Sequence, residues 1–111
     1  MEIKDKIVKD VTIVSINGSI DALTAPEITN YMNDLIASEK IKLVADFSGV
    51  DYTSSAGLRV LLAAVKATRA KGGDLYLVGV QPDVLKVLSL SGFTSIIKIF
   101  SEIDQAVNSF S

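Results

Sequence analysis

The segment LVADFSGVDYTSSAGLRVLLAAVKATRA, residues 43–70, constrains the fold more than any other part of the chain. Its first residues are apolar, which predicts a buried strand. The stretch from Ser48 to Thr53 interrupts the apolar run with glycine and aspartate, which favour turns. Apolar residues then recur at helical spacing from Leu58 onward. A strand, a turn and a long helix form the unit of a parallel α/β sheet, and partners usually bind beyond the carboxyl end of such a strand.

The rest of the chain repeats this alternation of strands and helices. A tight turn at Lys9-Asp10 should make the first two strands antiparallel, whereas crossover helices make the later strands parallel. The prediction is one α/β domain over residues 1–111, with a mixed, mainly parallel sheet, an antiparallel N-terminal strand and about four helices. Strands are expected at residues 2–9, 11–16, 41–47, 75–80 and 96–100, and helices at about 24–38, 54–70, 81–91 and 101–110.

Helix ends carry signals of their own. Thr24 and Glu27 have the spacing of a capping box, with threonine at the N-cap and glutamate three residues later. Gly72 in the sequence Lys-Gly-Gly is a stop signal after the second helix. Ser101 is expected to cap the last helix. These signals predict where the first and last helices begin and where the second ends.

Composition argues against several classes of function. The chain has no histidine and no cysteine, so it lacks the commonest general base, the commonest transition-metal ligand and any thiol nucleophile. A formal net charge of −2 argues against a broad nucleic-acid-binding surface. The longest apolar run, residues 60–65, is far below the roughly 20 residues of a membrane span, and the N-terminus has no signal-peptide pattern. We therefore expect a cytoplasmic protein without a cofactor and without direct nucleic-acid or membrane contacts.

Three local patterns coincide at the ends of predicted elements: Gly18 to Asp21, Val44 to Leu58, and the Lys-Gly-Gly stop. Together they resemble the STAS domain, which occurs in bacterial anti-sigma factor antagonists and in the cytoplasmic tails of sulfate transporters. The resemblance covers nearly the whole chain. Its most specific part is the run S-S-A-G-L at residues 54–58.

The resemblance implies that Ser55 is a regulatory phosphoserine, because the family often has D-S-[ST]-G-L at this point. Two residues depart from the family pattern: Ser54 replaces the usual aspartate, and Arg59 stands where glycine is frequent. The first difference leaves the kinase and partner specificity open, and neither removes the acceptor hydroxyl. From the residues alone, an N-cap is the favoured explanation of Ser55, and only the resemblance favours a phosphate acceptor. Ser54 is the alternative both as cap and as phosphate acceptor.

A partner-binding surface is expected around this turn. Asp21 lies beside the turn by resemblance, or else is a turn residue that bonds its own backbone. Gly57 inside a helix either admits the backbone of a partner or packs against the preceding strand. The expected partner-binding residues are Asp21, Ser54, Ala56, Gly57, Arg59, Val60 and Ala63.

Helical phasing separates two faces of the second long helix. One face, with Leu58, Leu61, Leu62 and Val65, should point to the core. The opposite face carries a small apolar strip that either a partner or another helix of the chain would cover. The residues of this strip are Val60, Ala63 and Ala67.

The leading hypothesis is a phosphorylation-controlled interaction switch. By resemblance, the unphosphorylated protein binds an anti-sigma factor of the serine/threonine kinase type and releases the sigma factor, and a serine phosphatase reverses phosphorylation. The alternative is a STAS subunit of a sensory or transporter-associated complex in which the serine is only a contact. A serine hydrolase would need Lys66 or Lys71 as its base, and both lie well down the helix. A nucleotide site lacks a P-loop, and a magnesium site at Asp21, Asp46 and Asp51 has no supporting spacing.

Overall fold

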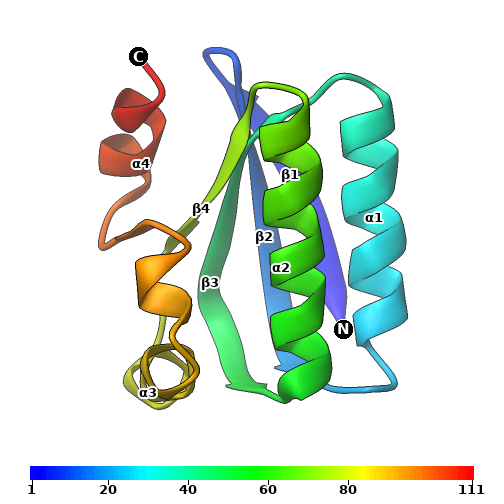
Figure 1. Ribbon diagram of the computed structural model, residues 1–111, viewed down its shortest axis with the longest axis vertical. Helices are drawn as coiled ribbons and strands as arrows, with labels where there is room; N and C mark the ends of the chain where they lie inside the picture. The colour runs from blue at the N-terminus through cyan, green and yellow to red at the C-terminus, as the bar shows by residue number, and fades with distance from the viewer.

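The computed structural model describes residues 1–111 as a five-stranded sheet with helices on both faces (Figure 1). The strands are β1 (Glu2–Val8), β2 (Val11–Ile20), β3 (Lys42–Thr53), β4 (Asp74–Val78) and β5 (Ile99–Phe100). The helices are α1 (Ala25–Ala37), α2 (Ser55–Ala70), α3 (Pro82–Leu90) and α4 (Ile103–Ser109), with a 3-10 turn at Phe93–Ser95.

The strands are ordered in the sheet as they are in the sequence. β1 is antiparallel to β2, and every later neighbouring pair is parallel. Lys9, with a φ of 58°, makes the tight turn between β1 and β2. The predicted mixed sheet with an antiparallel N-terminal strand and four helices is therefore confirmed. None of the helices is long and apolar enough to span a membrane.

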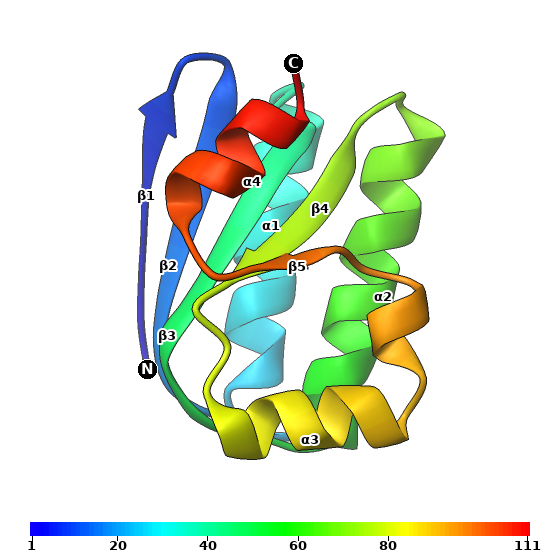
Figure 2. The same cartoon turned by 90° about the vertical axis from the view of Figure 1, so that its left-hand side faces the viewer.

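Helices α1 and α2 lie side by side on one face of the sheet, and α4 lies on the other (Figures 1 and 2). The larger core fills the space between the helix pair and the sheet, with Ile28, Phe47 and Leu61 fully buried. The smaller core lies under α4, where the rings of Tyr76 and Phe110 stack with centroids 4.2 Å apart. Burial on both faces explains why the central strands are almost continuously apolar.

Two strands run further than the sequence pattern predicted. Residues 48–53, expected as a turn, continue β3 and pair with residues 17–20 of β2. A Cβ on Gly49 would lie 1.7 Å from Oδ1 of Asn17, so the glycine allows this side chain to cross the neighbouring strand. Ser19 Oγ donates a hydrogen bond to Asp51 Oδ1 at 2.9 Å. The prediction of a turn is wrong because Gly49 leaves room for the Asn17 side chain of β2 and Asp51 accepts a hydrogen bond from Ser19 of β2.

The C-terminal third also differs from the prediction in its boundaries. β4 ends two residues early because Gly79, with a φ of 65°, turns the chain. The last strand begins only at Ile99, since the 3-10 turn precedes it. Glu102 rather than Ser101 is the N-cap of α4. The Ser101 hydroxyl instead donates to the side chain of Gln105 at 3.1 Å.

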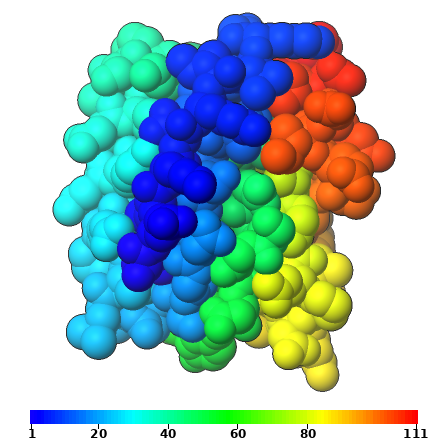
Figure 3. Space-filling view, turned by 180° about the vertical axis from the view of Figure 1, so that it is seen from behind, coloured from blue at the N-terminus to red at the C-terminus, as the bar shows by residue number.

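β1 is an exposed edge strand, visible along the surface in Figure 3. Tyr31 of α1 donates its hydroxyl proton to Asp5, which ties the edge strand to the helix layer. This hydrogen bond, with a contribution from burial, raises the pKa of Tyr31 to about 12. The β1–β2 turn lies at the upper end of the molecule in Figure 1, opposite the end at which α1 and α2 begin.

Candidate functional site

Two adjacent serines begin α2 and have different environments. Ser54 is the N-cap, with extended backbone angles of −96° and 180°, and its Oγ accepts a hydrogen bond from the N–H of Ala56 at 3.2 Å. The N–H of Ser54 donates to the carbonyl of Ile20 at 2.9 Å, which joins this turn to the end of β2. Ser55 is the first helical residue, and its exposed hydroxyl makes no hydrogen bond within the domain. Of the two, Ser55 has the uncommitted hydroxyl.

The loop between β2 and α1 adjoins this turn and is held by its own side chains. Oδ1 of Asp21 accepts hydrogen bonds from the N–H groups of Leu23 at 2.9 Å and Thr24 at 3.1 Å. Thr24 Oγ1 accepts from the N–H of Asp21 at 3.0 Å and donates to the carbonyl of Ser19 at 2.9 Å. The predicted capping box does not form, because the loop uses the Thr24 hydroxyl that would have bonded the N–H of Glu27. Asp21 therefore has the backbone-bonding role that was one of its two alternatives.

The same loop presents a residue that the sequence analysis missed. Leu23 is 90% exposed, more than any other large apolar side chain of the domain. Its backbone is fixed by the hydrogen bonds of Asp21, so the side chain projects from an ordered turn. The sequence did carry a signal for it: Leu23 is a large apolar residue between Asp21 and Thr24, two polar residues that favour turns, next to the predicted site. Single exposed apolar side chains are common, so Leu23 is of interest because it follows Ala22, which lines the groove described next.

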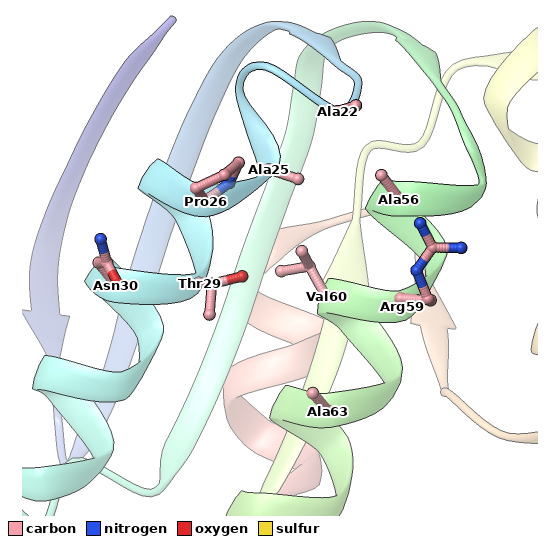
Figure 4. Close-up of a pocket in the computed structure, with 9 residues that line it drawn as sticks. All are labelled: Ala22, Ala25, Pro26, Thr29, Asn30, Ala56, Arg59, Val60 and Ala63. Atoms are coloured by element: carbon pink, nitrogen blue, oxygen red, sulfur yellow. The ribbon is translucent and has the colours of Figure 1, made fainter.

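A groove of about 480 Å³ lies between the N-terminal halves of α1 and α2 (Figure 4). It brings together four of the expected partner-binding residues, all from α2. Its walls are mostly small and apolar, and Arg59 is the single charged residue among them. The groove is lined by Ala22, Ala25, Pro26, Thr29 and Asn30 on one side and by Ala56, Arg59, Val60 and Ala63 on the other.

The predicted faces of α2 need correction. Val60, assigned to the outer strip, is only 9% exposed and packs into the main core. Leu58 and Leu62, assigned to the core face, are half-buried. Ala63 is exposed as predicted, and Ala67 is half-buried. The reason is that α1 packs along one flank of α2, so the helix is covered by two neighbours rather than by the sheet alone.

Gly57 is buried at the start of α2. A Cβ at this position would lie 2.2 Å from Oγ1 of Thr53 and 2.8 Å from Cγ2 of Ile20. The helix therefore approaches the ends of β2 and β3 more closely than any other residue would permit. This geometry favours the strand-packing alternative for Gly57 over direct contact with a partner.

The acidic residues near the site take part in separate local bonds. Oδ1 of Asp46 accepts from the N–H of Ser48 at 3.0 Å, and Asp51 accepts from Ser19. With Asp21 committed to its own loop, no group of three potential metal-ligating side chains forms. Lys71 bonds to Glu39 at 3.1 Å beyond the C-terminal end of α2, far from Ser55. None of these groups is hydrogen-bonded to the Ser55 hydroxyl.

The STAS domain family matches residues 2–106 of this chain. The chain belongs to that family. An anti-sigma-B factor antagonist of Listeria monocytogenes is 31% identical to this STAS domain over 99 residues, which cover 89% of the chain and 86% of the relative. An anti-sigma factor antagonist of Mycobacterium paratuberculosis, 25% identical, superposes with a TM-score of 0.88 over 97% of this chain and 92% of its own. A Thermotoga maritima protein, 28% identical, superposes with a TM-score of 0.92 over 96% and 92% of the two chains.

Proposed function

We propose that this STAS domain is an anti-sigma factor antagonist whose binding is controlled by phosphorylation of Ser55. The unphosphorylated domain binds an anti-sigma factor of the serine kinase type and so frees the sigma factor. The kinase phosphorylates Ser55, the complex dissociates, and a serine phosphatase regenerates the hydroxyl. The observation that carries the proposal is the exposed, unbonded hydroxyl of Ser55 at the first position of α2, beside a second serine that is occupied as the cap. The names of the relatives support the general role.

Phosphoryl transfer to Ser55 needs a general base, and the partner kinase would supply it. Ser55 Oγ would attack the γ-phosphorus of an ATP held by the kinase, forming an O–P bond while the bond to the departing ADP breaks. The proton of the hydroxyl must pass to a base, and this chain has no histidine. Lys66 lies about 16 Å along the helix axis from Ser55, at 1.5 Å per residue. The domain therefore acts as substrate and ligand, and the partner supplies catalysis.

A phosphoryl group at this position would act on binding rather than on folding. It adds a charge of about −1.5 to −2. The first turn of α2 has unpaired N–H groups and the positive end of the helix dipole, which favour an anion. A partner surface that packs on a neutral hydroxyl and on the small residues of the groove would lose its fit. A loss of about 3 kcal/mol would weaken binding more than 100-fold.

The proposed partner-binding face combines Ser55, the groove and Leu23. Ala56, Arg59 and Ala63 would contact the partner directly, because their side chains line the groove without being buried in the core. The remaining expected residues would act through the shape of the surface. Asp21 and Ser54 hold the two turns, and Gly57 and Val60 seat α2 on the core.

The test compares three variants with the wild-type domain and the cognate kinase. Ser55→Ala should accept no phosphate yet still bind, and Ser55→Asp should bind weakly because it carries a permanent charge. Ser54→Ala is the matched control and should still accept phosphate, although loss of the cap should lower the free energy of unfolding by about 1 kcal/mol. Mass spectrometry maps the phosphate, and calorimetry measures the affinity.

Two outcomes would contradict the proposal. Phosphate that persists in Ser55→Ala and disappears in Ser54→Ala would move the acceptor by one residue. No phosphate in any variant, with undiminished binding by Ser55→Asp, would exclude the switch. The second outcome would leave the alternative of a STAS subunit in a sensory or transporter-associated complex, with the serine as a contact residue.

A further inference from the structure

We propose that Arg59 binds the phosphoryl group carried by Ser55, which neutralises the single positive charge on the walls of the partner-binding groove. The inference deepens the proposed function and rests on Ser55 being the modified residue. It concerns an interaction within this chain, between a side chain that lines the groove and the modification beside it.

The geometry of α2 places the two residues together. Ser55 and Arg59 are four residues apart in one helix, so they occupy neighbouring positions on the same face. Side chains in helices lean toward the N-terminus, which carries a long residue back over the preceding turn. Figure 4 shows the guanidinium group of Arg59 directed along α2 toward the turn that begins at Ala56. A phosphoryl group on Ser55 would project from that turn.

The Arg59 guanidinium is uncommitted. The three ion pairs of the domain involve Lys42, Arg69 and Lys71. Arg69, the other arginine, donates to Asp74 at 3.0 Å and to the carbonyl of Ile96 at 2.6 Å. Arg59 is exposed and takes part in no comparable bond, so pairing with a phosphate breaks nothing. A guanidinium can give two parallel N–H bonds to phosphate oxygens, which makes it the better basic residue for this role.

The pairing has a consequence for the groove. Arg59 is the single charged residue on walls that are otherwise small, apolar or neutral. A partner that recognises the unphosphorylated groove with an acidic group would lose this cation once the phosphoryl group binds it. Phosphorylation would then act twice, by adding negative charge at Ser55 and by neutralising the positive charge next to it.

The experiment uses the full chain with phosphoserine incorporated at position 55 during synthesis, so that no kinase is needed. ³¹P NMR follows the second pKa of the phosphate, which is ordinarily about 6. Removal of the guanidinium in Arg59→Gln should raise this pKa by about 0.3 units or more, the size expected for a helical ion pair four residues apart. Arg59→Lys should restore part of the difference, since it keeps the charge but loses the paired N–H groups.

Lys66→Gln is the control, because Lys66 is an exposed cation of the same helix that cannot reach Ser55. It should leave the phosphate pKa unchanged, and the effect of Arg59→Gln should shrink in high salt. Equal pKa values in wild type and Arg59→Gln would overturn the inference, as would an equal rise in Lys66→Gln. Because the phosphate is installed without a kinase, these outcomes are distinguishable from a failure of the kinase to modify Ser55.

Discussion

At the scale of single residues, the site depends on which polar atoms are already bonded. The Ser54 hydroxyl, the Asp21 carboxylate and the Thr24 hydroxyl are all used to hold the two turns. The Ser55 hydroxyl and the Arg59 guanidinium have no partner in the domain. The adjacent serines therefore differ in availability, because the local hydrogen bonds occupy the hydroxyl of Ser54 and leave that of Ser55 free.

Asp21 offers a test that separates shape from charge. Asp21→Asn keeps an Oδ1 acceptor for the N–H groups of Leu23 and Thr24, so the free energy of unfolding should change by less than about 0.5 kcal/mol. Asp21→Ala removes the acceptor and should cost about 1–2 kcal/mol by chemical denaturation. Because Asp21 shapes the binding face by holding its loop, we expect Asp21→Asn to bind nearly as well as wild type and Asp21→Ala to bind more weakly. A sharp fall in Tm with normal binding by the folded fraction would show that the residue is only structural.

Leu23 should be an anchor for the partner. Leu23→Ala should weaken partner affinity about tenfold or more, because burial of a leucine side chain on binding is worth about 1.5–3 kcal/mol. Stability should not change, since the side chain is 90% exposed in the free domain. Leu90→Ala on α3 is the matched control, with an 80% exposed leucine outside the groove. Equal calorimetric affinities for wild type and Leu23→Ala would remove Leu23 from the proposed face.

At the scale of elements, α2 joins the core to the site. Gly57 brings its first turn against the ends of β2 and β3, and the helix then packs on the sheet through Leu61 and Val65. Ala63 faces outward along the groove from the same helix. One helix thus has a buried side that sets its position and an exposed side that a partner can reach.

The packing of α2 predicts unequal effects of two adjacent leucines. Leu61→Ala should lower the free energy of unfolding by about 2–5 kcal/mol, because the side chain is almost fully buried and its loss leaves a cavity. Leu62→Ala is the matched control and should cost less than half as much, since that leucine is half-buried. Chemical denaturation measures both. A loss below about 1 kcal/mol for Leu61→Ala would contradict the orientation of the helix.

At the scale of the whole molecule, the parallel strands place the two turns of the site at one end. β2 leads into the Asp21 loop and β3 leads into the Ser54 turn, and the two are hydrogen-bonded neighbours. The edge strand β1 carries alternating charges on its exposed length, which discourages pairing with another sheet edge. The molecule therefore presents its proposed binding face at the carboxyl ends of the strands.

This arrangement predicts that phosphorylation of Ser55 has local effects. The first turn of α2 accommodates the anion, so the fold and the Tm should be preserved. In a ¹H–¹⁵N NMR spectrum, shifts should be confined to the Asp21 loop, the Ser54 turn and the first turns of α1 and α2. Changes spread over α4, on the other face of the sheet, and over the β1–β2 turn, at the opposite end of the domain, would instead indicate a rearrangement of the whole domain.

The sequence alone determined the class of the fold and indicated where to propose the site. Apolar periodicity and stop signals such as Gly72 depend on local backbone preferences, so they gave the order and type of the elements and the mixed sheet correctly, but not the bounds of every strand. The run from Ser54 to Leu58 carried the family resemblance, and the comparisons confirm the family. These features were accessible because each is encoded within a few consecutive residues.

Only the tertiary structure decided where neighbouring elements touch. Gly49 is a turn residue by type, yet it lies in a strand because Asn17 crosses over it. Val60 is buried because α1 covers its flank of α2. The Thr24 hydroxyl bonds within the loop before α1 and forms no capping box, because Asp21 competes for it. The choice between Ser54 and Ser55 as cap followed from the bond between Ser54 and the end of β2. Each of these outcomes depends on a contact between residues that are adjacent only in the folded chain, which local propensity does not specify.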